Sequence, residues 1–271
     1  MTGSGTQANP YIVTTWEEFT QVFADAEYIE LGSDIQASDY PVNIVASKLL
    51  SLDGKGHSIT NIFSISDYAI TFNKQLGGVF NLTIKDISFD NINCQGNGFI
   101  RIGGTNDGGV FRLNNVAFNG SLYCDMLINS NTWGTTIMDS VGGNIHTNTE
   151  KFSLGTFGNN SKLNYGCLRI DYGSVTPDSG YSLYSATLTA YNTIFEINAP
   201  AGGKIYFGGC IYCAFTGSGT VWIISASGIN IVENTLDIYS SSTGTNYQLS
   251  SSDIRNIQVL YNLGFPVSGV V

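Results

Sequence analysis

Two charged residues and an aromatic residue lie together on a short strand-like segment and could bind a sugar. Side chains two positions apart share one face of a strand, so Leu168 and Ile170 point one way. Arg169 and Asp171 share the other face, and Tyr172 follows directly. A guanidinium, a carboxylate and an aromatic ring can together hold a sugar, but an Arg and an Asp on one face can equally be a surface ion pair. The segment is therefore a candidate carbohydrate-binding site with a structural alternative.

Trp133 is a second candidate for carbohydrate binding, because its polar surroundings, residues 131–134, are typical of a loop. An exposed indole ring can stack on a sugar, and a partly buried structural ring is the alternative. Trp222 lies in an apolar run and is better explained as a half-buried ring. The predicted carbohydrate-binding residues are Arg169, Asp171, Tyr172 and Trp133.

No residue pattern predicts a catalytic or metal site. Cys210 and Cys213 form a Cys-x-x-Cys pair, but their surroundings are typical of a strand, which would place the two thiols on opposite faces. A zinc site would need two further ligands, and the histidines His57 and His146 each stand alone in the sequence. Glycoside hydrolysis needs two carboxyls about 5–9.5 Å apart, and no pair can be assigned that spacing. We predict no catalytic residue, no metal and no cofactor, and we lean against an enzyme.

The charge of the chain excludes several classes of partner. Eleven Lys and Arg residues face 21 Asp and Glu residues, which gives a net charge of −10, and only 12% of all residues are charged. Binding to nucleic acid or to an anionic membrane needs clustered basic residues, so neither is expected. No basic and apolar leader and no membrane-spanning apolar run is evident, and five scattered cysteines indicate reduced thiols. We expect a chain that is made in a cytosol and is not exported.

The elements that must position these residues are short strands that repeat along the chain. Residues 82–89 and 111–118 show the same alternation of apolar residues 29 positions apart. Residues 188–195 keep this alternation, and residues 231–236 show a weaker version of it. In each repeat an Asp, Asn or Glu stands between two strands, and Asp or Asn can turn a corner because it tolerates a left-handed backbone. Such repeats are typical of a solenoid whose stacked coils bury one continuous core.

The two ends of the chain differ from the repeats. Thr15 and Glu18 fit a capping box that opens a short amphipathic helix. The predicted organisation is an N-terminal cap over residues 1–27, a β-solenoid over 28–251 and a C-terminal cap or docking tail over 252–271.

Several motifs resemble those of pectate-lyase-like right-handed parallel β-helix proteins, a family that includes phage tailspikes and appendages. They are the segments at residues 3–6, 9–13 and 16–19, the Gly-x-Gly-His pattern within 52–59, and residues 77–84. The resemblance covers roughly the first hundred residues. It implies an all-β, single-stranded right-handed parallel β-helix with a helix that plugs the N-terminal end. Lyases, hydrolases, adhesins and phage tailspikes all use this fold, so the motifs fix no activity.

We expect a bacteriophage virion structural protein: a tail appendage, a collar, or a capsid-decoration or fibre component. The resemblance implies a homotrimer, because phage β-helices commonly trimerise side by side, with other virion proteins and host cell-surface polysaccharide as further partners. The expected location is the virion, after synthesis in the host cytoplasm. A polysaccharide lyase or glycoside hydrolase of the β-helix type is the alternative, and a bacterial surface adhesin is the second alternative.

Overall fold

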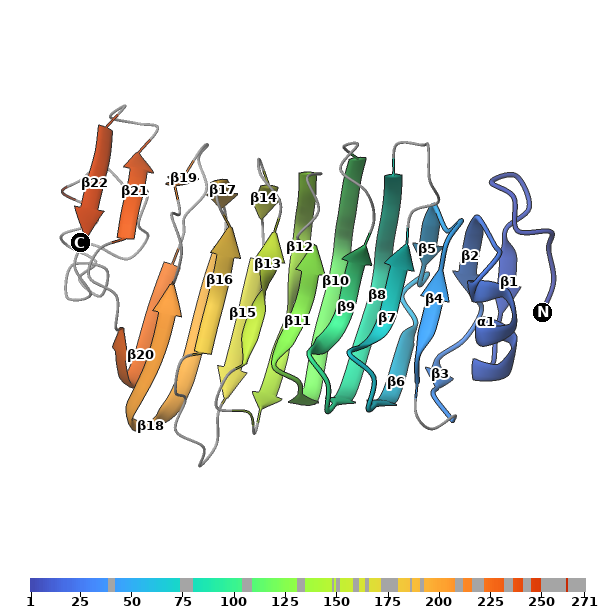
Figure 1. Cartoon of the computed structure of the whole chain (residues 1–271), viewed down its shortest axis with the longest axis horizontal. Coiled ribbons are helices and arrows are strands. Elements are labelled where there is room, and N and C mark those ends of the chain that lie inside the picture. Colours follow the sequence, from blue (N-terminus) through green and yellow to red (C-terminus); the bar gives the residue numbers. More distant parts are fainter. Residues whose placement is uncertain are drawn as a thin grey trace.

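A computed structural model shows that the chain forms the predicted parallel β-helix. It describes residues 1–38, 42–73, 80–103, 109–130, 135–147, 149 and 152–157, the strands between Ser161 and Leu249, and residue 262. The described side chains lie mainly within residues 1–152. Strands stack side by side along the long axis of the molecule, with α1 (Trp16–Phe23) at the N-terminal end (Figure 1).

The strands form three faces of the solenoid. The first face holds β1 (Tyr11–Val13), β2 (Tyr28–Leu31), β5 (Ser51–Asp53), the first halves of β8 (Phe80–Cys94), β10 (Gly109–Tyr123) and β12 (Thr135–Thr147), then β14 (Ser161–Leu163), β17 (Thr187–Ala190), β19 (Tyr212–Phe215) and β21 (Leu236–Ser240). The second face holds β3 (Ile35–Gln36), β6 (Ser58–Ser64), the second halves of β8, β10 and β12, then β15 (Gly166–Asp171) and the first parts of β18 (Thr193–Phe207) and β20 (Trp222–Ile231). The third face holds β4 (Ile44–Ala46), β7 (Tyr68–Asn73), β9 (Gly98–Gly103), β11 (Met126–Ser130), β13 (Ser153–Phe157), β16 (Gly180–Ser185) and the remainder of β18 and β20.

The predicted repeat sets the register between coils. Leu82 pairs with Phe111 and Phe89 pairs with Phe118, so the two segments stack with the 29-residue offset seen in the sequence. The corner between the first and second faces falls at Asp86 and Asn115, whose φ angles are 51° and 54°. The Asn115 side-chain amide donates to Asp86 Oδ1 at 2.9 Å, which ties one corner to the next. The prediction that an acid or an amide turns each corner is confirmed for these two coils.

The N-terminal helix closes the core as predicted. The Thr15 hydroxyl accepts a hydrogen bond from the Glu18 backbone N–H at 3.2 Å, which satisfies one of the free donors of the first turn. The Glu18 carboxylate returns to Thr14 rather than to Thr15, with the Thr14 N–H 2.8 Å away. Phe23 on the buried face of the helix lies 5.6 Å from the ring of Phe72 in β7, so the helix packs onto the end of the solenoid core.

The far end of the chain departs from the parallel pattern. β21 pairs with β22 (Thr245–Leu249) in the antiparallel sense, although the predicted solenoid runs to residue 251. Only residues 241–244 separate the two strands, and so short a connection cannot carry the crossover that a parallel pair needs. The predicted cap or tail at 252–271 lies outside the described residues except for Asn262, which is helical and exposed. Among the helices that the structure describes, none is long and apolar enough to cross a membrane.

Candidate functional site

A second column of corners, within the second face, bends the outer surface of the solenoid. Asn61, Asn91 and Gly120 occupy it on successive coils, with φ angles of 58°, 54° and 77°. Asparagine and glycine are the residues that adopt this left-handed conformation at least cost. Ile62 pairs with Ile92 in the next coil, and the register then shifts by one residue between Asn119 and Leu122, at the Gly120 corner. The corners therefore recur on successive coils, with one extra residue on the third coil.

A groove of about 380 Å³ lies beside this column. We call it the amide groove, and β3, β6, β8 and the residues adjoining β3 line it: Gln36, Ala37, Ser38, Asn61, Ile62, Phe63, Asn91 and Asn93. Tyr123 on the following coil adjoins this lining in the strand register, because Phe63 pairs with Asn93 and Asn93 pairs with Tyr123. Tyr123 is 47% exposed, so its ring is available at the surface. An aromatic position thus stands on each side of Asn93 along the axis of the solenoid.

Hydrogen-bonding groups in the amide groove are left without a protein partner. The side-chain oxygen of Asn93 is buried and accepts no hydrogen bond from the described residues. A buried polar oxygen without a partner costs about 1–3 kcal/mol, so such groups are uncommon and often mark a ligand or an ordered water. The side chains of Gln36 and Asn61 are exposed and bond to no other described residue. Each amide offers both a donor and an acceptor.

The surface next to the groove is fixed by hydrogen bonds between coils. The Asn119 amide donates to Ser88 Oγ at 3.0 Å and to Asp90 Oδ1 at 3.2 Å. The side-chain oxygen of Asn119 accepts from the Asn144 backbone N–H at 3.0 Å. The Asn91 side-chain oxygen accepts from the Ser121 backbone N–H at 3.1 Å. The backbone and side chains that border the groove are therefore held in place before any ligand arrives.

A cluster of four charges occupies the outside of the first face, near its N-terminal end. Asp53 is 5% exposed, and its carboxylate lies 2.9 Å from Lys85 Nζ and 3.1 Å from Lys55 Nζ. Lys55 also lies 3.1 Å from Glu30. Burial raises the pKa of Asp53, but hydrogen bonds from Lys85 and Lys55 outweigh this effect and hold the pKa below its ordinary value. Hydrogen bonds to Asp53 and Glu30 raise the pKa of Lys55.

This cluster stays ionised at neutral pH, so it suits structure better than proton transfer. A general acid or base works best when its pKa lies near the working pH, and here the pKa of the buried carboxyl and that of its Lys55 partner both move away from neutrality. In the described part of the chain, no group of three His, Cys, Asp or Glu side chains could hold a metal ion.

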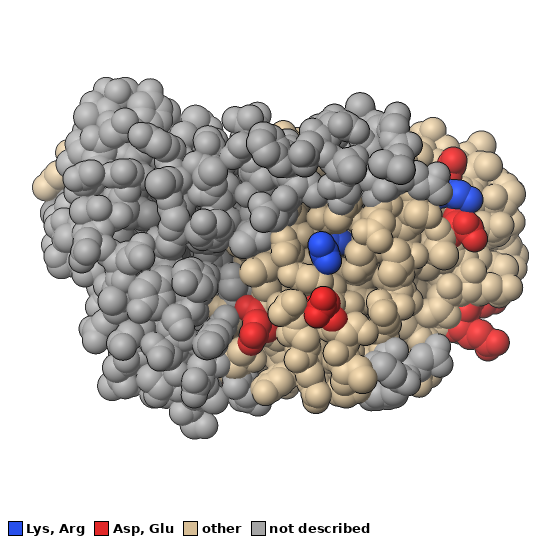
Figure 2. Space-filling view, in the orientation of Figure 1, with Lys and Arg blue, Asp and Glu red and all other residues tan. Residues whose placement is uncertain are grey.

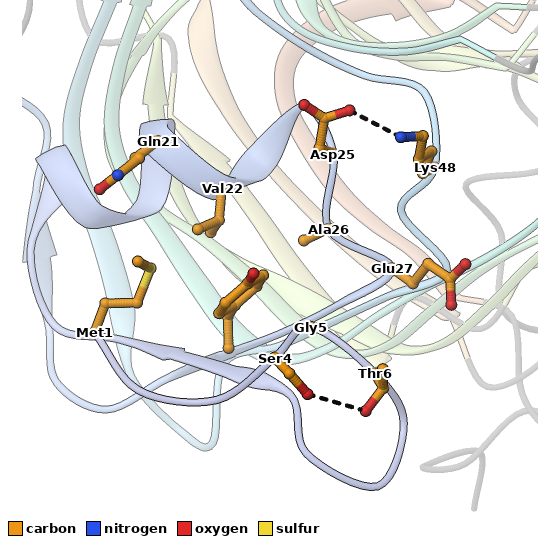
Figure 3. Close-up of a pocket in the computed structure, with 11 residues that line it drawn as sticks. Met1, Ser4, Gly5, Thr6, Gln21, Val22, Asp25, Ala26, Glu27 and Lys48 are labelled. Atoms are coloured by element: carbon orange, nitrogen blue, oxygen red, sulfur yellow. Dashed lines mark hydrogen bonds and ion pairs between the residues drawn. The ribbon is translucent and has the colours of Figure 1, made fainter.

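A larger hollow of about 610 Å³ lies at the N-terminal end, between the N-terminal arm and α1 (Figure 3). Ser4 and Thr6 face each other on the arm, 3.5 Å apart. On the opposite side, Asp25 and Lys48 form an ion pair of 3.0 Å. Much of the polar rim is thus already paired within the protein, and the amide groove offers more free hydrogen-bonding groups.

The structure describes only part of the predicted carbohydrate-binding set. Asp171 ends β15 and lies 3.4 Å from Nδ1 of His146, on the neighbouring coil. Arg169 pairs with Asn144 on one side and with Glu196 on the other in the strand register. Tyr172 and Trp133 lie outside the described residues, so their role in sugar binding stays a prediction.

Each histidine, although isolated in the sequence, lies beside a carboxylate of another coil. His146 lies beside Asp171, and His57 lies 3.4 Å from Asp34 on the preceding coil. Parallel stacking places residues from adjacent coils next to each other, which a scan along one strand does not reveal. In the Cys-x-x-Cys pair, Cys210 lies outside the described residues, whereas Cys94 and Cys124 are buried and free.

The amide groove was missed from the sequence, although a signal for it exists. Asn61, Asn91 and Gly120 recur at intervals of 30 and 29 residues, close to the spacing of the strand repeat. Comparison of the chain with protein-family models, with curated proteins and with solved structures found no match. A function for this protein is therefore inferred from its fold and from the groove.

Proposed function

We propose that this protein is a β-helical scaffold that binds carbohydrate through the amide groove. The observation that carries the proposal is the buried, unpaired side-chain oxygen of Asn93 between the aromatic positions Phe63 and Tyr123. Sugar hydroxyls donate and accept hydrogen bonds, as amide side chains do, and the apolar face of a sugar packs on an aromatic ring. A saccharide would supply the hydrogen bond that Asn93 lacks.

We further propose that the scaffold belongs to a bacteriophage particle, as a tail appendage, collar, or capsid-decoration or fibre component. The sequence resemblance to phage β-helices and the low charge density support this part of the proposal. On the face drawn in Figure 2, the charged side chains of described residues are few and lie among uncharged ones. A homotrimer that contacts other virion proteins and recognises a host-surface polysaccharide is the corresponding assembly.

Binding is proposed ahead of cleavage because of the state of the carboxylates. Asp53 is held between two lysines, and Asp90 is hydrogen-bonded to Asn119 and Ser88. Neither carboxylate stands free beside the amide groove in a position to protonate a glycosidic oxygen.

A glycan array probed with the full chain tests carbohydrate binding. We expect binding that Asn93→Ala reduces at least ten-fold, because the substitution removes the acceptor that faces the ligand. Asn114→Ala is the matched control: Asn114 is exposed on the first face, away from the groove, and should be replaceable without loss. If no glycan binds, or if both substitutions act equally, the proposed function is wrong.

Light scattering tests the assembly separately. A stable trimer of the 29.1 kDa chain is the expected result. A monomer would contradict a free-standing trimeric appendage without affecting the carbohydrate-binding part.

A further inference from the structure

We infer that the amide groove binds a neutral, extended polysaccharide whose chain runs parallel to the solenoid axis, with successive sugars on successive coils. This inference rests on the proposed carbohydrate binding and adds the class and direction of the ligand.

The direction follows from the columns of equivalent side chains. Parallel strands are separated by about 4.8 Å, so groups in register repeat at that interval along the axis. One column runs from Gln36 through Thr60 and Asp90 to Asn119. A polymer of identical units that follows the axis meets a similar set of groups at each step, whereas a polymer that crosses the coils does not.

The column at the far wall provides both packing and hydrogen bonding. It consists of Phe63, Asn93 and Tyr123. Tyr123 is 47% exposed, and Asn93 Oδ1 is buried without a partner. A sugar stacked on Tyr123 would place its neighbour in the chain near Asn93, where a hydroxyl can donate to the unpaired oxygen.

Charge selects a neutral ligand. Among the described residues, no lysine or arginine lines the amide groove, and the charged residue in the adjoining column is Asp90. A uronic acid carboxylate would need a basic partner to offset the loss of its hydration, and Asp90 would repel it. The net charge of −10 acts in the same direction over longer distances.

The extent of the described groove sets the length of ligand that it can hold. Its lining residues lie on the coils of β3, β6 and β8, which span about 10 Å, and Tyr123 on the coil of β10 adjoins the far end. Affinity should therefore rise with each sugar added until the span is filled and then stay constant. Each added sugar that makes one net hydrogen bond should strengthen binding about five-fold.

Isothermal titration calorimetry with the full chain tests this inference. The probes are cello-oligosaccharides and manno-oligosaccharides from disaccharide to hexasaccharide, with oligogalacturonates of the same lengths as the anionic comparison. We expect stepwise tightening and then a plateau for at least one neutral series, and at least ten-fold weaker binding of the oligogalacturonates. Tyr123→Ala should weaken the longest oligosaccharides most, because Tyr123 lies on the coil that follows the groove lining, next to Asn93, and Asn114→Ala should change nothing.

The outcomes separate this inference from the proposed function. Binding that is independent of length, or tighter for oligogalacturonates, overturns the inference while carbohydrate binding on the array stands. Loss of all binding on the array removes the proposed function itself. Circular dichroism and the thermal midpoint of each variant show whether it is folded, and Tyr123→Phe provides a second variant that keeps the ring if Tyr123→Ala does not fold.

Discussion

Asp53 gives the sharpest test of how the first face is held together. Its carboxylate accepts hydrogen bonds from Lys85 Nζ at 2.9 Å, from Lys55 Nζ at 3.1 Å and from the Lys55 backbone N–H at 3.0 Å. Asp53→Ala removes all three, and Asp53→Asn keeps an oxygen for the backbone N–H but loses the charge. The perturbation therefore separates the charge of Asp53 from its local hydrogen bond.

The expected loss follows from the exposure of the partners. A hydrogen bond to a charged group contributes about 1.5–3 kcal/mol when buried, and an exposed ion pair contributes about 0–1 kcal/mol. Asp53 is buried, but the side chains of Lys55 and Lys85 are 48% and 38% exposed and can rehydrate. We therefore expect Asp53→Ala to lower the free energy of unfolding by about 2–3 kcal/mol and Asp53→Asn by about 1–2 kcal/mol.

The loss should also depend on pH with a defined sign. The folded protein holds the pKa of Asp53 below its ordinary value of 3.8, so the carboxylate stabilises the fold above that pH. This stabilisation disappears as the pH falls through the lowered pKa, because the protonated acid no longer pairs with Lys55 and Lys85. The difference between the wild type and Asp53→Asn should shrink accordingly.

Guanidinium unfolding followed by circular dichroism, at neutral pH and at several acidic values, measures both effects. If unfolding proves irreversible, shifts in the thermal midpoint at a fixed scan rate serve the same purpose. An Asp53→Asn variant as stable as the wild type at neutral pH, or a difference that does not shrink as the pH falls below 3.8, would refute the reasoning.

Three further predictions concern the core. The ring centroid of Phe89 lies 5.2 Å from that of Phe99 and 5.9 Å from that of Phe118. In guanidinium unfolding, Phe89→Ala should lower the free energy of unfolding by about 3–5 kcal/mol, and Phe89→Leu should lower it clearly less. Equal losses for the two variants would argue against packing of the rings. Gly143 has a φ angle of 137°, and a Cβ added there would lie 2.0 Å from the Phe118 carbonyl oxygen. Gly143→Ala should therefore lower the midpoint of thermal unfolding by several degrees, and an unchanged midpoint would contradict this expectation. Burial raises the pKa of the Cys94 thiol to about 12, so iodoacetamide should label it at neutral pH only after unfolding, which mass spectrometry of peptides can check.

The repeat and its corners could be predicted because each depends on local chemistry. Alternation of apolar residues identifies the inward side of a strand, and the left-handed preference of Asp86 and Asn115 marks the corner between two strands. The stacking of Leu82 on Phe111 then follows from the common frame. Thr15 was recognisable for the same reason, since a cap acts within one turn.

The spacing of Asn61, Asn91 and Gly120 was visible in the sequence, but the walls of the groove and the histidine pairs could not be predicted, because they depend on the register between coils. Coil length varies from 23 residues between Ile29 and Leu52 to 32 residues between Leu52 and Ile84. A sequence scan with one fixed period therefore loses the register, and side chains such as Asn93 and Tyr123 become neighbours only when the register is known. The free energy that selects the register comes from core packing over the whole coil, which no single segment encodes.

The coil-on-coil arrangement also has a consequence for biosynthesis. Each described coil pairs with the coil before it, and the helix that covers the end of the core directly follows β1, the first strand of the first face. Translation therefore delivers the lid before the later coils and then adds one coil at a time, and each new coil can pair with a coil that is already formed. The nascent chain can grow as an ordered rod while its remaining part is still on the ribosome, and only the newest strand edges are open to mispairing with other chains.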